Sequence, residues 1–424
     1  MRRILFIVEQ CNPEWASVPL VAFNLWDALS QRADVHLVTH ERNKDALEKV
    51  RNRNGQNRHI DYIGESTLLK RYFAFVSGMT TRGGTNWPLF HALSYPVYAS
   101  FNSRVYAAFS QAVRQGKYDV VHAFTPVLPR YPVAMVRACE TTPFVLGPVN
   151  GGLPFPPAFG EVRRKESGLF NFLRSFTRLI PGYAQTYNKA ASVLAGSRYT
   201  REMLEHRFTG LAPRMALFHE NGLAQDFFRP HQTTSQVFTL LFTGRLVPYK
   251  GADMLLDALA RSGLDAFRLI IVGDGPERPN LEKQAATLGL TDKVHFTGWV
   301  PQKETAPYYA QADLFAFPSV REFGGAVVLE AMAAGLPCVV VDHGGISEYV
   351  DESCGIRIAP ESREHVVNGF AEAIRHLAQD RDHRETLAHG AVIRAESYRW
   401  ESKADWLIAH YEQLLGSTHP KEHP

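Results

Sequence analysis

Cysteine is scarce in this chain, and the spacing of its cysteines argues against a fold that is stabilised by disulfides or by zinc. The 424 residues include four cysteines, Cys11, Cys139, Cys338 and Cys354, which are spread widely along the sequence. None belongs to a C-x-x-C pair or has metal-ligand spacing, so neither a disulfide framework nor a zinc site is expected. The reducing cytoplasm is therefore the expected compartment.

Long apolar runs are also missing. No stretch approaches the roughly 18 apolar residues that a membrane span needs. The N-terminal MRRILFIVEQ has an apolar run too short for a signal peptide and is typical of a buried first strand, Ile4 to Val8. We therefore expect any membrane association to be peripheral.

The absence of two kinds of motif narrows the range of possible functions. No G-x-G-x-x-G follows the first predicted strand, where the chain reads EQCNPEWASVPL, and this argues against a dinucleotide-binding dehydrogenase. No helix-turn-helix, RNP-like or zinc-finger pattern is evident, so nucleic acid is the least favoured partner.

What the chain does contain suffices for two domains, each with its own core. Hydrophobic residues make up 45% of the sequence and charged residues 21%, which is ordinary for globular protein. The charge is uneven: residues 1–228 hold 27 Lys+Arg and 17 Asp+Glu, and the remainder holds 19 and 26. A basic first half suits an anionic membrane surface or an acidic acceptor.

Short apolar runs that end in turns recur in both halves. Those of the first half begin at Ile4, Val35, Asp119, Thr142 and Ala191, and those of the second lie within 240–244, 268–278, 294–301 and 313–319. Their alternation with helical segments predicts an α/β fold with doubly wound parallel sheets. Ligands of such sheets bind at the carboxyl ends of the strands.

The most informative segment is PSVREFGGAVVLEAMAAGLPCVVVDHGG, Pro318 to Gly345. Glu322 and Glu330 stand either side of seven residues, and the helix-forming run around Glu330 predicts a loop that opens a helix. Free N–H groups at such a helix start suit phosphates. The two carboxylates would accept hydrogen bonds from hydroxyls of the same ligand.

A second segment, LLFTGRLVPYKGADMLLDALA, predicts a buried strand, a loop and an amphipathic helix. Its loop carries Arg245, whose guanidinium is a planar fork of N–H donors, and Lys250, whose ammonium is a compact point charge. Such a pair suits a diphosphate leaving group.

Together the two segments resemble the retaining family-4 glycosyltransferases of GT-B fold, whose signature is E-x7-E. The resemblance is clear over about residues 238–350 and weaker over the N-terminal half. Most members read E-G-F-G where this chain has Glu322-Phe323-Gly324-Gly325. The family implies an acceptor-binding domain over 1–220, a donor-binding domain over 221–399 and a C-terminal helix, 400–417, that crosses back to the first domain.

The resemblance also implies roles for single residues. Glu322 would contact the donor sugar, Glu330 the ribose, and Arg245 and Lys250 the diphosphate. His122, at the end of a predicted strand, occupies the position of a cleft histidine with a catalytic role. The alternative for His122 is a histidine that is hydrogen-bonded at a strand end.

Further candidates follow from the same resemblance. The donor site would also include Gly244, Gly273, Trp299, Val300, Phe323, Gly324 and Gly325. The acceptor or cleft residues would be Asn12, Trp15, Asn150, Gly151 and Gly152. Simple packing remains an alternative for Trp299, and a plain turn for Asn150-Gly151-Gly152.

The expected reaction is transfer of a sugar from a nucleoside diphosphate sugar, UDP- or GDP-linked, to an acceptor hydroxyl with retention of configuration. The acceptor would be a glycan or a lipid-linked molecule in glycolipid, lipid-linked oligosaccharide or extracellular polysaccharide biosynthesis. Two cations and loop amides would neutralise the leaving group without a metal or cofactor. The alternatives are an inverting GT-B transferase, a GT-B epimerase or phosphorylase, and a noncatalytic nucleotide-sugar-binding protein.

Two aromatic-rich stretches favour attachment to the inner face of the membrane. Residues 161–190 place Leu169, Phe172, Leu173, Phe176, Leu179 and Ile180 at helical spacing beside basic residues, a profile of interfacial helices. Residues 68–79 and 87–101 have a similar composition. Internal packing of these faces is the alternative for each.

Overall fold

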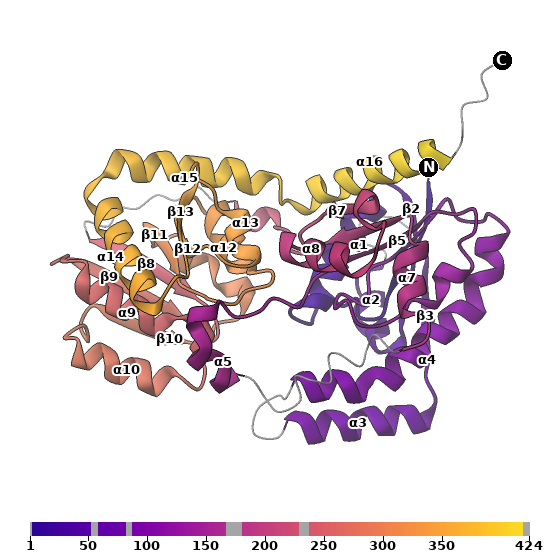
Figure 1. Ribbon diagram of the computed structural model, residues 1–424, viewed down its shortest axis with the longest axis horizontal. Coiled ribbons are helices and arrows are strands. Elements are labelled where there is room, and N and C mark those ends of the chain that lie inside the picture. The colour runs from indigo at the N-terminus through magenta and orange to yellow at the C-terminus, as the bar shows by residue number, and fades with distance from the viewer. Residues whose placement is uncertain (1, 52–57, 82–86, 167–179, 229–236, 419–424) are drawn as a thin grey trace, which may run out of the picture. The chain divides into compact units, whose positions relative to one another are not determined.

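The computed structural model describes residues 2–51, 58–81, 87–166, 180–228 and 237–418 (Figure 1). The chain forms two compact units. Unit 1 contains Met1–Gly152, Ser167–Glu220 and Trp400–Pro424, and unit 2 contains Leu153–Glu166 and Asn221–Arg399. Each unit is built on one parallel sheet, so the expected architecture of two doubly wound α/β domains is confirmed.

The seven-stranded sheet of unit 1 has the order β3-β2-β1-β4-β5-β6-β7. Its strands are β1 (Arg3–Val8), β2 (Asp34–His40), β3 (Ile60–Ile63), β4 (Val120–Ala123), β5 (Phe144–Val149), β6 (Ser192–Ala195) and β7 (Met215–Leu217). Its helices are α1 (Val18–Ser30), α2 (Lys44–Glu48), α3 (Thr67–Thr81), α4 (Trp87–Arg114), α7 (Tyr183–Lys189), α8 (Arg198–Arg207) and α16 (Trp400–Thr418).

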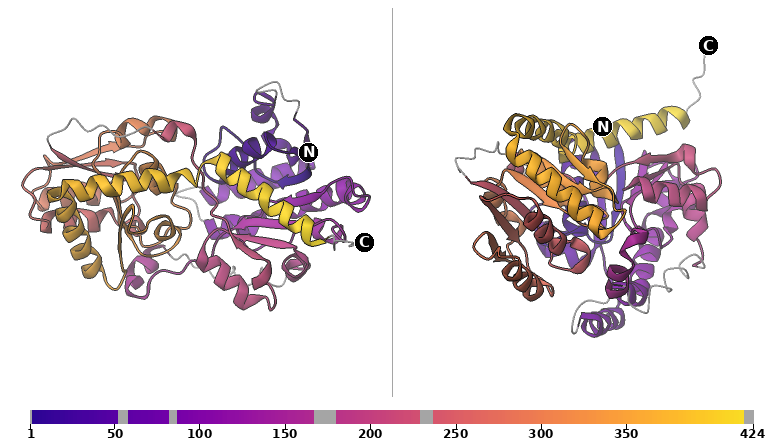
Figure 2. Two further views of the ribbon diagram at one scale, coloured as in Figure 1. Left: turned by 90° about the horizontal axis from the view of Figure 1, so that it is seen from above. Right: turned by 60° about the vertical axis from the view of Figure 1, so that its left-hand side comes forward.

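Both faces of this sheet are covered. Successive side chains of β1 alternate between the faces: Ile4, Phe6 and Val8 pack with residues of α1 and α16, whereas Leu5 and Ile7 pack with residues of α4 and α7. Figure 2 shows α16 running across the unit 1 sheet. Burial on both faces explains why the strand reads as a continuous apolar run.

The six-stranded sheet of unit 2 has the order β10-β9-β8-β11-β12-β13. Its strands are β8 (Phe238–Thr243), β9 (Phe267–Val272), β10 (Val294–Gly298), β11 (Leu314–Phe317), β12 (Cys338–Val341) and β13 (Gly355–Ile358). Its helices are α5 (Gly160–Glu166), α9 (Ala252–Arg261), α10 (Arg278–Thr287), α11 (Ala306–Tyr309), α12 (Ala326–Ala333), α13 (Gly345–Tyr349), α14 (Arg363–Gln379) and α15 (Arg381–Glu396).

One segment lies in a different unit from the one expected. Leu153–Glu166, which the sequence placed in the first domain, belongs to unit 2. The reason is packing, because Phe159 is buried in the unit 2 core and Phe155 and Val162 pack against that core.

Each sheet reverses its strand order at one point. In unit 1 the chain runs from β1 outward to β3 and then returns to β4 on the other side of β1. In unit 2 the same reversal separates β8 from β11. Such switch points, at the carboxyl ends of the strands, are where open α/β sheets bind ligands.

In the part of the chain that the structure describes, no helix combines the length and the hydropathy that crossing a membrane demands. The aromatic stretch expected in 161–190 is described only at its two ends, by α5 and α7. Leu169, Phe172, Leu173, Phe176 and Leu179 lie outside the described residues.

Candidate active site

The loops after β8 and β11 meet at the switch point of unit 2. Val320 N–H donates to the carbonyl of Tyr249 at 2.9 Å, and the Ser319 hydroxyl donates to the same carbonyl at 3.2 Å. The two loops are therefore held together by the backbone, so the side chains they carry have fixed neighbours.

These loops bring Lys250 and Glu322 together as an ion pair in which both side chains are largely buried. The Lys250 ammonium also lies 5.0 Å from the ring centre of Phe317, at the end of β11. A cation and a carboxylate are thus in contact at the carboxyl edge of the sheet. Both are residues that the sequence singled out.

Arg245 shares the loop of Lys250. Its Nη2 donates to the hydroxyl of Tyr249 at 3.4 Å, and the residue is exposed. Gly244 precedes it directly after β8, and the Gly244 N–H donates to the carbonyl of Val272 at the end of β9. The two predicted phosphate-binding cations therefore leave the same strand, with Arg245 open to solvent.

A third loop, after β12, contacts the backbone of Glu322. The Gly345 N–H donates to the Glu322 carbonyl at 3.0 Å. A Cβ on Gly345 would lie 1.9 Å from the carbonyl oxygen of Phe323, so only glycine fits there. This close approach fixes the backbone on both sides of the Glu322 side chain.

Helix α12 begins directly after this loop. Gly325 at its N-cap has a φ of 56°, and no side chain caps the helix. The Val328 N–H donates to the Gly325 carbonyl at 3.0 Å, so the N–H groups of Ala326 and Val327 are the ones that suit an anion. Gly324 precedes the cap, and Phe323 lies with its ring 5.4 Å from the Arg321 guanidinium.

Glu330 differs from our expectation of two carboxylates facing one ligand. Its Oε1 accepts from Gln302 Nε2 at 2.6 Å and its Oε2 from the Tyr309 hydroxyl at 2.8 Å. Burial raises the pKa of Glu330, and the two hydrogen bonds oppose that rise. In this structure the helix turns Glu330 into the unit 2 core, while Glu322 stays at the loop edge.

The remaining predicted donor residues follow β9 and β10. Gly273 N–H donates to the carbonyl of Gly298 at 3.0 Å. Trp299 is exposed, so the packing alternative is wrong for this side chain, and Val300 packs partly buried against the unit 2 core. These residues lie at the same edge of the sheet as the Lys250–Glu322 pair, because all of them follow carboxyl ends of strands.

Leu153–Glu166 contributes to this site although no local sequence pattern predicted it. Arg321 Nε donates to the Leu153 carbonyl at 3.3 Å, and its guanidinium lies 4.8 Å from the ring centre of Phe155. His343 Nε2 lies 2.9 Å from the Pro154 carbonyl. The segment therefore packs beside Glu322 and the β12 loop, which a prediction from local patterns could not detect.

His122 lies in the core of unit 1. Its Nε2 lies 2.6 Å from the Gly147 carbonyl, and its Nδ1 is hydrogen-bonded to the Tyr411 hydroxyl. Since a carbonyl only accepts, we assign the proton to Nε2, and Nδ1 accepts from Tyr411. Burial lowers the pKa of His122 to about 4. This geometry is that of a histidine hydrogen-bonded at a strand end, and it leaves neither ring nitrogen for a substrate.

The predicted cleft residues of unit 1 are partly tied into its framework. Asn150 is buried and accepts from the hydroxyls of Ser197 and Thr200, each at 2.9 Å. Gly151 N–H donates to the Thr200 hydroxyl at 3.0 Å. Asn150 and Gly151 are thus anchored in an irregular loop.

The other three cleft candidates differ in exposure. Gly152 is exposed, with a φ of 86°. Asn12 is buried and accepts from the Glu14 N–H at 2.9 Å. Trp15 is exposed on the loop after β1, where it is open to a ligand.

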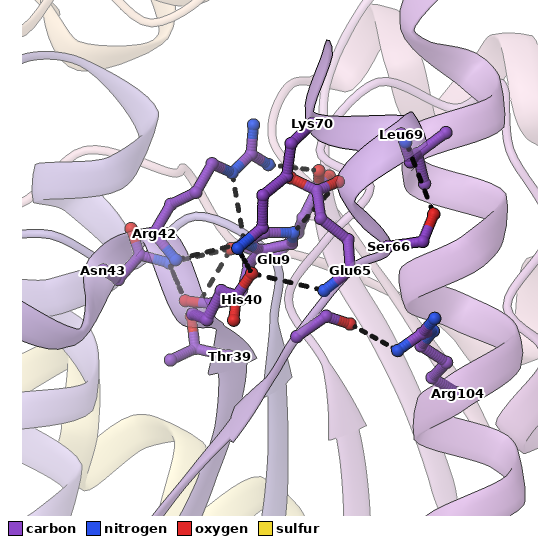
Figure 3. Close-up of polar contacts among 12 residues, drawn as sticks. Glu9, Thr39, His40, Arg42, Asn43, Glu65, Ser66, Leu69, Lys70 and Arg104 are labelled. Atoms are coloured by element: carbon purple, nitrogen blue, oxygen red, sulfur yellow. Dashed lines mark hydrogen bonds and ion pairs between the residues drawn. The ribbon is translucent and has the colours of Figure 1, made fainter. Parts of the chain in front are cut away.

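A charged cluster that we did not predict from the sequence lies at the carboxyl ends of β1, β2 and β3 in unit 1. Glu9 follows β1 and Glu65 follows β3, while His40 is the last residue of β2 and Arg42 lies two residues after it (Figure 3). Arg42 Nη2 lies 3.0 Å from Glu9 Oε1, and His40 Nε2 lies 3.5 Å from Glu65 Oε2. The detectable signal was a charged residue one or two positions after each of three strands.

Within the described residues, His376, Asp380 and His383 are the group with ligand atoms close enough to hold a metal ion, all within 4.8 Å. They lie at the junction of α14 and α15, and none follows a strand of the unit 2 sheet. They take no part in the site described above.

Comparison with protein families gives a match within unit 2. A family model described as "Glycosyl transferases group 1" matches residues 224–391, less than half of the chain. The matched range lies inside unit 2 and holds Arg245, Lys250, Glu322 and Glu330.

Two curated relatives match the chain in part. A D-inositol 3-phosphate glycosyltransferase of Nocardia farcinica is 35% identical over 188 residues, 42% of this chain and 41% of the relative. A GDP-mannose-dependent alpha-(1-6)-phosphatidylinositol monomannoside mannosyltransferase of Mycobacterium tuberculosis is 34% identical over 232 residues, 49% of this chain and 58% of the relative. The chain spans about half the length of the relatives it matches.

Solved structures match over nearly the whole chain. A glycosyltransferase of Rickettsia africae has a TM-score of 0.63 at 15% identity and covers 98% of both chains. The chain has the GT-B fold. Anabaena HepE in complex with UDP-glucose has a TM-score of 0.61 at 20% identity, covering 97% of this chain and 100% of that one. At such identities the likeness concerns the GT-B fold alone.

Proposed function

We propose that this chain is a retaining glycosyltransferase similar to family 4, which transfers a sugar from a nucleoside diphosphate sugar to an acceptor hydroxyl. The observation that carries the proposal is the Lys250–Glu322 ion pair at the switch point of unit 2. The match of unit 2 to group 1 glycosyl transferases supports it, as do the names of the relatives, which describe glycosyl transfer.

Lys250 and Arg245 would bind the diphosphate. When the phosphates take Lys250, the Glu322 carboxylate is released and can accept hydrogen bonds from the hydroxyls of the donor sugar. Charge grows on the diphosphate as it leaves, so both cations act most strongly in the transition state. The uncapped start of α12 adds partial positive charge at the same edge.

The transfer would take place on one face of the sugar. The acceptor oxygen bonds to the anomeric carbon on the face from which the diphosphate departs, and the electron pair of the broken bond goes to the diphosphate. A phosphate oxygen takes the proton of the acceptor hydroxyl. No side-chain nucleophile is needed, and the configuration is retained.

Glu330 would bind the ribose only after rearrangement. Its oxygens are engaged by Gln302 and Tyr309, and the Gln302 amide is the partner that a ribose hydroxyl would displace. The donor is proposed to be a UDP- or GDP-sugar, and no cofactor or metal is proposed.

We further propose that the enzyme works in the cytoplasm, on a glycan or lipid-linked acceptor at the inner membrane surface. Helix α3 supports peripheral attachment. Leu68, Phe75 and Met79 are 80%, 66% and 45% exposed, and their spacing of seven and four residues places them on one face of the helix. Arg71 beside this stripe is exposed, which suits anionic headgroups.

A ligand-binding experiment tests the donor assignment. The chain is screened by thermal shift against UDP, GDP, ADP and their sugar conjugates, because a ligand that binds the folded state raises Tm. We expect a shift with one nucleotide in the wild type and in Lys283→Ala, whose lysine lies on α10, and a lost shift in Lys250→Ala. Equal shifts in all three proteins would contradict the diphosphate role of Lys250.

Turnover separates the alternatives. With the donor identified, Arg245→Ala and Lys250→Ala are each expected to lower kcat/KM by about 100-fold or more, as the loss of a transition-state charge contact does. Nucleotide binding without any transfer or hydrolysis would indicate a noncatalytic protein, and a product of opposite anomeric configuration would indicate an inverting enzyme.

A further inference from the structure

The segment Leu153–Glu166 is the first part of the chain to enter unit 2, and it lies beside the loops that carry the Lys250–Glu322 pair. Its first residue, Leu153, is buried. A Cβ on Gly344, in the loop after β12, would lie 2.6 Å from Leu153 Cδ2 and 2.4 Å from the Glu322 carbonyl oxygen. The Leu153 side chain and the Glu322 backbone therefore contact the same glycine.

Two hydrogen bonds join the same segment to the loops after β11 and β12. Arg321 Nε donates to the Leu153 carbonyl at 3.3 Å. His343 Nε2 lies 2.9 Å from the Pro154 carbonyl, and since a carbonyl only accepts, this nitrogen carries the proton. Both loops thus donate to carbonyl groups of consecutive residues in the segment.

The far end of the segment reaches the other loop of the site. Helix α5 lies beside the turn Pro248–Lys250, which follows β8. Phe159, just before α5, is buried in the unit 2 core, and Tyr249 packs against the same core. The segment therefore lies beside the loops of both members of the ion pair.

Arg321 and Phe323 flank Glu322 in the chain, and their side chains meet. The Arg321 guanidinium lies 5.4 Å from the ring centre of Phe323 and 4.8 Å from that of Phe155, distances at which cation–π attraction acts. The Glu322 side chain between them extends to Lys250 instead. The contact of Arg321 with the two rings therefore fixes the loop on both sides of Glu322.

These contacts become more important when the donor binds. In the free protein, Lys250 itself holds the Glu322 carboxylate. In the proposed function the diphosphate takes Lys250, so Glu322 loses that partner as its carboxylate turns to the sugar. Its position then depends on the backbone around it, which is held by the Gly345 N–H and by the contacts of Arg321.

We propose that Arg321, seated on Phe155, is a positioning residue for Glu322, and that the Leu153–Glu166 segment thereby forms part of the donor-sugar site. The guanidinium and the ring act together on the loop, and Glu322 acts on the hydroxyls of the sugar. This inference rests on the proposed function, to which it adds the element that holds Glu322 once phosphate engages Lys250.

A selective loss of sugar-conjugate binding tests the positioning role. The full-length chain is titrated by calorimetry with UDP, UDP-glucose, UDP-galactose and UDP-N-acetylglucosamine, and with GDP and GDP-mannose. The conjugate that binds the wild type most tightly, and its bare nucleotide, are the two probes. Arg321→Ala is expected to weaken binding of the conjugate about five- to tenfold, because Glu322 no longer meets the hydroxyls in good geometry.

Binding of the bare nucleotide is the readout that separates positioning from stability. Its Kd should change by less than about twofold in Arg321→Ala, because the bare nucleotide lacks the sugar hydroxyls that Glu322 accepts from. A general weakening of unit 2 would reduce binding of both probes. Arg381→Ala, which removes a guanidinium paired with Glu385 on α15, is the control and should bind both probes as the wild type does.

A second, milder variant tests the partner of Arg321. Phe155→Leu keeps an apolar side chain and removes the ring, so it should weaken binding of the conjugate about threefold and spare the bare nucleotide. Added to Arg321→Ala, it should cause no further loss beyond about twofold, since side chains that act through one contact are not additive.

The outcomes distinguish this inference from the proposed function. An equal loss of both probes in Arg321→Ala, or a wild-type ratio of their Kd values, would overturn the inference. A selective loss in Arg321→Ala that Phe155→Leu does not share would show that Arg321 acts on the donor directly, and would overturn it as well. If the wild type binds none of these nucleotides or conjugates, the proposed function fails instead.

Discussion

The Lys250 ammonium pairs with the Glu322 carboxylate between two loops that leave β8 and β11, the strands on either side of the unit 2 switch point. Each group is thus the other's partner in this structure. If a diphosphate takes the place of Glu322 at Lys250, as we propose, binding of the nucleotide and release of the carboxylate are one event.

Removing the charge of Glu322 should therefore have opposite effects on binding and transfer. In Glu322→Gln we expect the affinity for the bare nucleoside diphosphate to rise about two- to fivefold, because the competing ion pair is gone. Transfer should fall strongly, because the donor sugar loses a charged hydrogen-bond acceptor and keeps only the weaker amide oxygen. Calorimetry and initial rates measure the two effects, and a parallel loss of both would contradict the competition.

Gly345 is expected to tolerate no side chain. Gly345→Ala would place a Cβ 1.9 Å from the Phe323 carbonyl oxygen, and relief of that overlap should lower the free energy of unfolding by about 1–3 kcal/mol. Gly78→Ala on α3, where a Cβ meets nothing within 4 Å, is the matched control and should be neutral or stabilising by up to about 1 kcal/mol. Denaturant unfolding compares them.

Acid should destabilise unit 1 through His122. Its pKa is about 4 in the folded chain against 6.5 as the ordinary value, so between these pH values the unfolded chain binds a proton that the folded chain does not. The free energy of unfolding should fall as pH drops from 6.5 toward 4, by about 3 kcal/mol for this residue. The free energy of unfolding, measured between pH 7 and pH 4.5, should depend less on pH in His122→Gln than in the wild type. An equal dependence on pH in both proteins would contradict the assignment.

Attachment through α3 predicts binding to anionic vesicles. The wild type should sediment with vesicles that contain phosphatidylglycerol and less with vesicles of phosphatidylcholine alone. Phe75→Ser should reduce the bound fraction several-fold, because it removes the central residue of the exposed stripe. Ile393→Ser, at an exposed apolar residue of α15 in unit 2, is the control. Equal loss in both variants would point to a general effect of surface hydrophobicity.

The fold could be predicted from the sequence because its buried strands are read directly as apolar runs. The positions of Lys250 and Glu322 followed from the loops that end those runs. The orientation of Glu330 could not be predicted, since it depends on Tyr309 and Gln302 from other elements. His122 was uncertain for a similar reason, because its partner Tyr411 lies 289 residues away.

The cluster around Glu9 was missed because its members come from three separate strand ends. Each is unremarkable in its local sequence. The parallel register that sets β1, β2 and β3 side by side is what gathers them, and no spacing in the chain expresses that register.

The path of the chain between the units has a consequence for how they form. The chain enters unit 2 at Leu153–Glu166, returns to unit 1, and completes unit 2 before Trp400 begins α16. Because Trp400, Leu407 and Tyr411 fill the core over β1, the unit that starts first during synthesis is the one that closes last. Until α16 has left the ribosome, that face of β1 has α1 but lacks α16, while unit 2 already has all of its strands.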